Sequence, residues 1–287
     1  MKAKLYPVYI FFTFLFLSCT NLCAQEAVQL KYDFKIGEKT EYKLKIEGDV
    51  TVEINTQAGE ATTKNSAKMD GVFLYTHEIV KVDEENKSAQ LNVVYGKSYM
   101  NTVVQNNIIP NKDLELLAGK TAKVTLNSKG EVKDYILPKD LPGSLQNADF
   151  RKMFVVFPEH KLRVGESWIK SEENVDNKNE NFKITNIVQN TYTFLGVEKK
   201  KGYACAKVKL ESNTSGITES KDTQIIVEGK VEGNSEGIIF YDLNNGRVIY
   251  SQINTKVFNN TKTQENKNSV PVVTNVDTVM TVITEIL

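Results

Sequence analysis

Apolar and polar residues alternate one by one over most of this chain of 287 residues. The longest series places an apolar residue or a glycine at every second position from Tyr42 to Ile54. Successive side chains of an extended strand point to opposite faces, so this period of two is typical of strands with one buried face. We therefore predict a mainly β fold with one or two large, curved antiparallel sheets. Shorter series of the same kind occur at residues 28–34, 73–79, 89–95, 238–240 and 249–257.

Two further strands are predicted from composition. The segment from Val272 to Leu287 carries Val, Thr, Ile and Met on both faces, which is typical of a central strand. A second run, from Tyr203 to Val208, contains Cys205. Because cleavage of the leader described below would leave Cys205 as the one cysteine, no disulfide framework is expected. We interpret Cys205 as a small, half-buried strand residue and not as a reactive thiol.

Polar segments separate the predicted strands. The runs at 83–87, 127–130 and 244–246 read as tight turns, and the Asn245-Gly246 step is the strongest hairpin signal among them. Four longer polar stretches have nothing to bury, so we expect solvent-facing loops at hairpin tips. These stretches are residues 55–67, 172–181, 211–223 and 259–269.

Little helix is expected. Asn111 is placed to cap a short helix that reaches Leu117 and is closed by Gly119. A second short helix is predicted over residues 144–155, after Pro142-Gly143 and before Pro158. It would lie in a connecting segment, residues 138–161.

The chain contains a pair of similar segments. Residues 34–39 (FKIGEK) and 162–167 (LRVGES) share an apolar, basic, β-branched, Gly, Glu order, and each precedes an aromatic residue, Tyr42 or Trp168. One interpretation is a duplication, with a first β half at 25–137 and a second at 162–287. The other is that Gly-Glu and Asn-Gly turns are simply common in β proteins. Under both, we expect structural turns at Gly37, Gly130, Gly165 and Gly246.

The first 24 residues have the layout of a secretory signal peptide. Lys2 and Lys4 precede an apolar run at 8–17, which is too short to cross a bilayer, and no later stretch is longer. Two processing routes stay open: cleavage after Ala24, or lipidation of Cys19. Either route predicts export to the periplasm or the outer membrane without a transmembrane span.

The chain also resembles a known family. The segments LKYDFKIGEKTEYKL (30–44), FPEHKLRVGESW (157–168) and GYACAKVKL (202–210), with the leader and the closing Asn-Asn-Gly hairpin, look like those of exported Gram-negative proteins of unknown function. The resemblance implies an all-β exported protein. It transfers no activity and no catalytic residue.

Composition and motifs argue against most chemistry. Basic and acidic residues are equal in number, 36 of each, so a nucleic-acid partner is not expected. The two histidines, His77 and His160, lie far apart in sequence, and no zinc-ligand spacing, nucleophile elbow or phosphate loop occurs. We therefore predict no cofactor, no metal site and no catalytic residue.

Aromatic residues favour a binding function. The chain has 13 Phe and 12 Tyr, and those not needed for the core would line a ligand cavity inside a curved sheet. The leading hypothesis is a non-catalytic envelope protein that binds a lipid or another apolar or amphipathic ligand. The alternatives are a surface or periplasmic interaction module with a protein partner, and a hydrolase with scattered carboxylates.

Overall fold

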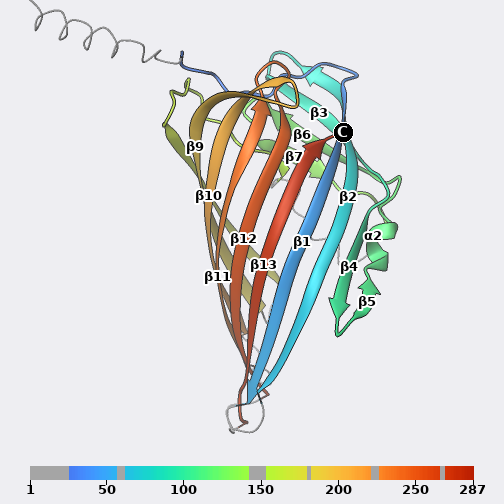
Figure 1. Ribbon diagram of the computed structural model, residues 1–287, viewed down its shortest axis with the longest axis vertical. Coiled ribbons are helices and arrows are strands. Elements are labelled where there is room, and N and C mark those ends of the chain that lie inside the picture. Colours follow the sequence, from blue (N-terminus) through green and yellow to red (C-terminus); the bar gives the residue numbers. More distant parts are fainter. Residues whose placement is uncertain (1–25, 57–61, 142–152, 180–181, 221–225, 266–268) are drawn as a thin grey trace, which may run out of the picture.

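The computed structural model describes residues 26–56, 62–141, 153–179, 182–220, 226–265 and 269–287. These residues form one antiparallel sheet in the order β7-β6-β3-β2-β1-β13-β12-β11-β10-β9-β8, with a β4–β5 hairpin attached to β2 (Figure 1). The predicted mainly β, antiparallel and curved architecture is confirmed. The elements are β1 (Lys39–Thr56), β2 (Thr63–Asp83), β3 (Ser88–Tyr95), β4 (Tyr99–Val104), β5 (Asn107–Pro110), α2 (Lys112–Glu115), β6 (Thr121–Asn127), β7 (Val132–Ile136), β8 (Ser167–Asn179), β9 (Phe182–Lys200), β10 (Tyr203–Ser220), β11 (Ile226–Asp242), β12 (Arg247–Gln264) and β13 (Val272–Ile286).

The last strand lies at the centre of the sheet. β13 pairs with β1 on one side and with β12 on the other, with Tyr42 opposite Ile286 and Tyr250 opposite Glu285. The prediction of a central strand at the end of the chain is therefore confirmed. This arrangement joins two series of strands, β1-β2-β3-β6-β7 and β8-β9-β10-β11-β12, each of which follows chain order.

The two series share local details. The amide of Gly37 donates to the carbonyl of Ile79 at 2.8 Å, and the amide of Gly165 donates to the carbonyl of Phe194 at 2.7 Å. Both glycines have positive φ, 81° and 88°. Directly after Ile79 and after Phe194 a β-bulge interrupts the pairing with the next strand. By this register Trp168 corresponds to Thr40 and not to Tyr42, and the half boundaries at 137 and 162 stay a prediction.

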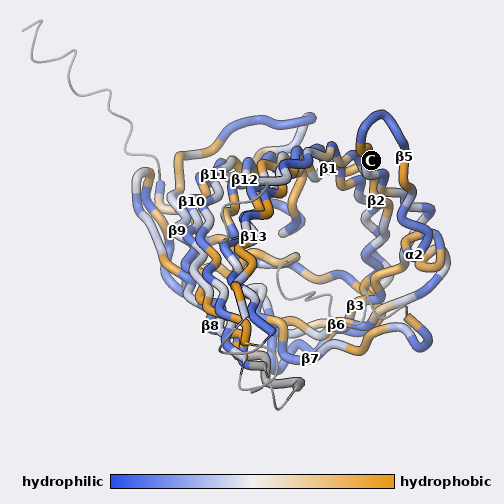
Figure 2. Tube along the Cα trace, turned by 90° about the horizontal axis from the view of Figure 1, so that it is seen from below, coloured by the Kyte–Doolittle hydropathy of each residue, from blue (hydrophilic) through white to orange (hydrophobic). Residues whose placement is uncertain are grey.

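The long strands extend well past the short ones. β1, β2 and β9–β13 converge at one end of the molecule, whereas β3, β6 and β7 lie only near the other (Figure 1). Seen along the strands, the sheet curves round and has an inner and an outer face (Figure 2). A row of paired inward residues divides the sheet into two parts. We call upper the part that includes this row and the side of β3, β6 and β7, and lower the part between the row and the end where the long strands converge. The row is Tyr192, Leu210, Gly237, Ile253, Val282 and Ile46.

The hydrophobic core occupies the upper part. Every buried apolar side chain that the structure describes on the long strands lies there, including Phe194, Val208 and Tyr241. Two segments outside the sheet cover this core, and we call them the crossing segments: residues 28–34 and 153–162. They are tied together by backbone hydrogen bonds between Val28 and Leu162 at 2.9 and 2.8 Å.

The first crossing segment corrects one sequence prediction. Alternation at 28–34 predicted a strand, but only an isolated bridge at Val28 forms there. The segment is instead held against the turn between β6 and β7, where the amide of Tyr32 donates to the carbonyl of Ser128 at 2.7 Å. Leu30 and Tyr32 are buried nonetheless. The alternation thus reflects alternate burial against the end of the sheet and not pairing within it.

The polar stretches correct a second prediction. Most residues of the four stretches predicted as loops belong to strands. β8 continues to Asn179, β10 to Ser220 and β12 to Gln264, and β2 begins at Thr63. Backbone pairing does not depend on apolar side chains, and polar ones also pair across strands here. Asn260 donates to Asn275 at 2.6 Å, for example.

The two helix predictions have different outcomes. The short helix after Asn111 is confirmed as α2, although it ends at Glu115 and not at Leu117. The Asn111 side chain accepts from the amide of Asp113 at 3.1 Å, and Gly119 has a positive φ. The predicted helix at 144–155 falls mostly on residues 142–152, outside the described residues. Of its described residues, Met153 to Val155 are not α-helical.

Candidate functional site

A cavity of about 320 Å³ lies between the inner face of the upper sheet and the two crossing segments. This volume is within the range of about 300–1,000 Å³ common for small-molecule sites. Most of its lining is aromatic or aliphatic and comes from strands that are far apart in sequence. The apolar lining residues are Tyr32, Phe34, Tyr42, Leu44, Tyr75, Ile79, Leu91, Met153, Phe154, Val155, Tyr192, Leu210, Ile239, Val248, Ile253 and Val282.

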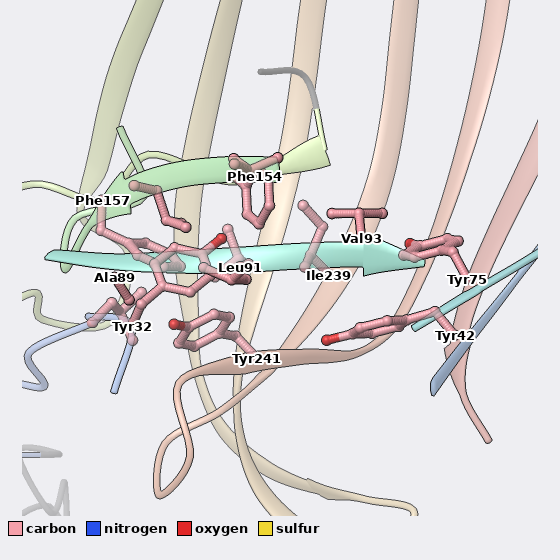
Figure 3. Close-up of a cluster of buried hydrophobic side chains, with 14 of the residues drawn as sticks. Tyr32, Tyr42, Tyr75, Ala89, Leu91, Val93, Phe154, Phe157, Ile239 and Tyr241 are labelled. Atoms are coloured by element: carbon pink, nitrogen blue, oxygen red, sulfur yellow. The ribbon is translucent and has the colours of Figure 1, made fainter. Parts of the chain in front are cut away.

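An aromatic cluster forms one wall of the cavity and fixes the crossing segments. The ring of Tyr32 packs edge-on against Tyr241 at 5.5 Å and against Phe154 at 6.2 Å between centroids (Figure 3). Its hydroxyl accepts a hydrogen bond from the amide of Val155 at 3.0 Å. The hydroxyl of Tyr241 donates to the carbonyl of Lys31 at 2.8 Å. Each buried hydroxyl therefore holds a crossing segment in place.

The tyrosines of this wall do not ionise at neutral pH. Burial raises the pKa of Tyr32, Tyr42 and Tyr75 well above the ordinary value of 10.0. Tyr42 and Tyr75 face each other across β1 and β2 and stack at 5.2 Å. They present uncharged aromatic side chains to the cavity.

Glu38, Thr40, His77 and Arg247 come together in the lining, and we call this group the polar end of the cavity. The other polar lining residues are Asp33, Asn245, Ser251 and Thr284. Arg247, the first residue of β12, reaches across to β1 beyond the end of β13. Its Nη1 donates to Glu38 Oε1 and to Thr40 Oγ1, each at 3.0 Å. Its Nε lies 3.8 Å from the carboxylate of Asp242, which is fully buried.

His77 lies next to this ion pair. It is paired with Thr40 across β1 and β2, and its ring packs against Tyr42 at 5.0 Å and Phe154 at 5.5 Å. Burial lowers the pKa of His77 to about 4, so the imidazole is neutral at physiological pH. His77 lies on β2 and is half-buried. The sequence did not indicate that it faces a cavity.

The glycines selected from the sequence lie at turns around this site. Gly130 and Gly246 have positive φ. An added Cβ at Gly130 would meet Val155 of the second crossing segment and Tyr32 of the first, and one at Gly246 would meet Lys31 and Asp33 of the first. Gly37 and Gly165 open β1 and β8 with free space around them. None of the four contributes a functional group.

The remaining predicted residues lie away from the cavity. Cys205 is a fully buried free cysteine, and burial raises the pKa of its thiol to about 11. His160 is exposed. Cys19 and the leader lie outside the described residues.

Sequence reasoning missed the residues that define the polar end. In the sequence Glu38 and Arg247 stand out only as the residues directly after turn glycines, Gly37 and Gly246. A charged residue next to a turn is usually solvated, so nothing in the sequence marked these two as partners. They are 209 positions apart.

Two negative observations concern the described residues. No three His, Cys, Asp or Glu side chains among them come together in a group that could hold a metal ion. Within the same part of the chain, no helix is both long and apolar enough to cross a membrane.

The fold and cavity define a curved antiparallel sheet protein with an internal, mostly apolar site. A family described as a family of unknown function (DUF6263) matches residues 143–248. The expected resemblance to a family of unknown function is thus confirmed. No curated protein matches.

Three solved structures are distantly similar to this chain. The hypothetical lipoprotein YmcC of Escherichia coli is 12% identical with a TM-score of 0.24, over 79% of this chain and 82% of that one. A putative exported protein with a YmcC-like fold from Bacteroides fragilis is 8% identical with a TM-score of 0.21, over 86% and 97%. A DUF1329 family protein from Desulfovibrio piger is 11% identical with a TM-score of 0.17, over 82% and 83%. At these scores the likenesses carry no argument about function.

Proposed function

We propose that this is an exported, non-catalytic envelope protein that binds an apolar or amphipathic ligand in the cavity. The observation that carries the proposal is an apolar space of about 320 Å³ with a small polar group at one end. Ligand sites commonly combine an apolar lining with a few polar groups that fix orientation. The amino-terminal leader supports action outside the cytoplasm, in the periplasm or at the outer membrane.

A cavity-filling variant tests the binding site. Ile253 lines the cavity, so Ile253→Trp should place an indole ring in it and block uptake of a fluorescent lipid probe by the purified protein. Val257→Trp is the matched control, because Val257 lies on the same strand and face but in the lower part. Equal probe binding by both variants, each with a cooperative melting transition, would contradict the proposal.

Native mass spectrometry of protein purified from its own envelope gives an independent test. We expect a co-purifying lipid that the Ile253→Trp variant lacks. The mass of the mature amino terminus from the same sample distinguishes Gln25 from an acylated Cys19. A protein that remains in the cytoplasm would contradict the exported location.

A second candidate function, the interaction module, is favoured by one exposed patch. The β4–β5 hairpin and the turn after α2 expose Tyr99, Ile108, Ile109 and Leu116, and Ile108 is 68% exposed. Among the described strands β5 pairs only with β4, which leaves its other edge open to a partner strand. A photocrosslinker at Ile108 should then capture one envelope protein that a crosslinker at Val279, on the outer face, does not. The same products at both positions would argue against this candidate.

A further inference from the structure

Three buried polar atoms around the cavity have no hydrogen-bond partner. They are Glu38 Oε2, His77 Nε2 and Arg247 Nε. All three belong to residues that line the cavity, although they come from three different segments of the chain. Arg247 Nε lies 3.8 Å from the Asp242 carboxylate and is not counted as a ligand contact. Buried polar atoms are nearly always hydrogen-bonded in native proteins, so the unpaired Glu38 Oε2 and His77 Nε2 beside the cavity point to a ligand group there.

The charges at this end limit what the ligand group can be. Arg247 and Glu38 already neutralise each other at 3.0 Å, and each side chain is only 19% exposed. A further carboxylate, Asp242, lies behind the guanidinium. A ligand carboxylate would bring a third negative charge beside a single guanidinium, and burying an unpaired charge costs several kcal/mol.

The unpaired atoms also limit the hydrogen bonds that the ligand group makes. Glu38 Oε2 can only accept a hydrogen bond, so the ligand group must donate one to it. Neutral His77 can do either at Nε2, depending on its tautomer. A hydroxyl group is uncharged, and it donates one hydrogen bond while accepting others.

We propose that the polar end of the cavity selects an amphipathic ligand with an uncharged, hydroxyl-bearing head group and disfavours one with a carboxylate. A monoacylglycerol represents the preferred chemistry, and a free fatty acid with the same chain represents the disfavoured one. This inference rests on the proposed ligand-binding function and specifies the class of ligand.

Competition between matched ligands tests the selection. A fluorescent lipid probe with an uncharged head is displaced from the wild-type protein by monolauroylglycerol or by laurate, which have the same acyl chain. We expect monolauroylglycerol to compete about tenfold better at neutral pH, because laurate must bury an unpaired charge. Equal or better competition by laurate overturns the head-group selection while leaving ligand binding intact. A wild-type protein that takes up no probe overturns the proposed function itself.

Two glutamine variants locate the cause. Glu38→Gln removes one negative charge from the polar end, so the preference for monolauroylglycerol should shrink several-fold. Glu166→Gln is the matched control, because Glu166 follows Gly165 in the corresponding turn and its Oε2 accepts from the Arg163 amide at 2.9 Å, away from the cavity. An unchanged ligand ratio in a folded Glu38→Gln protein overturns the assignment to Glu38. The wild-type competition decides the selection itself even if that variant fails to fold.

Discussion

The upper and lower parts of the sheet contain the same strands with the same alternation, yet only the upper part has a packed core. On β1, Tyr42 in the upper part is buried, whereas Val50 and Val52 in the lower part remain partly exposed although they share its face. The upper inner face carries large side chains and is covered by the crossing segments. The lower inner face carries mostly small or β-branched residues, such as Gly48, Thr278 and Gly233. Alternation therefore determines which face a residue occupies, but burial requires a second layer to cover that face.

The largest expected difference between the two parts is in stability. Phe194 is 1% exposed in the upper part, so Phe194→Ala should cost about 3–5 kcal/mol of unfolding free energy through lost transfer energy and a cavity. Val52→Ala in the lower part should cost less than about 1 kcal/mol, because its side chain is already partly in water. Urea denaturation of both variants measures the two values. Similar costs would mean that the lower face is packed in solution.

The pH dependence of stability should also arise from the upper part. Burial lowers the pKa of His77 from 6.5 to about 4, so between these values the unfolded chain binds a proton that the folded protein does not. Stability is therefore full above pH 6.5 and falls as the pH drops towards 4, by on the order of 3 kcal/mol. His77→Gln should flatten this dependence in urea midpoints, and His160→Gln, at an exposed site, should not. An identical pH profile for His77→Gln would show that His77 is not the buried titrating group.

Two glycine variants compare a turn under the crossing segment with an open one. An added Cβ at Gly246 would contact the Asp33 amide, and it would lie 2.8 Å from the Lys31 carbonyl, so Gly246→Ala must displace the cover of the cavity. We expect a loss of more than about 2 kcal/mol, because steric displacement adds to the left-handed backbone cost of about 1–2 kcal/mol. Gly37→Ala has the same backbone cost and no contact, so it should lose only that smaller amount. Thermal unfolding separates the two, and equal losses would show that the crossing segment yields easily.

The smallest stability effect is expected at the cavity itself. Leu44 is partly buried and lines the cavity, so Leu44→Ala should cost only about 1 kcal/mol, below the 2–5 kcal/mol of a fully packed leucine. The same variant should weaken uptake of a fluorescent lipid probe with an uncharged head group. A large stability loss, together with a wild-type protein that binds no probe, would favour the interaction module over the ligand-binding function.

Much of the fold could be predicted from local patterns. The period of two predicted the inward residues of β1, and the cap at Asn111 predicted α2. The mixed apolar faces of Val272–Leu287 predicted the central strand. The polar parts of β10 and β12 were not predicted as strand. Strands pair through their backbones, and polar side chains do not prevent this pairing. The strand predicted at 28–34 was wrong because alternate burial also occurs in an extended segment that crosses the end of a sheet.

The candidate site could not be predicted in the same way. Its polar end depends on β13 ending where Arg247 begins β12, so that the guanidinium can reach Glu38 and Thr40 across the sheet. Such a contact has no local signal, because its partners are separated by more than 200 residues.

The sequence by itself determined the secondary structure class, the faces of the long strands and the turns that connect them, because these follow from side-chain periodicity and backbone conformations within a few residues. Only the tertiary structure decided which part of those faces is buried, where the cavity lies and which charged groups meet at its end. Those properties depend on the curvature of the whole sheet and on two crossing segments that pack from outside it. Periodicity can state that Tyr42 and Val52 share a face, but only the position of Tyr32 and Phe154 above the sheet decides that one is buried and the other is not.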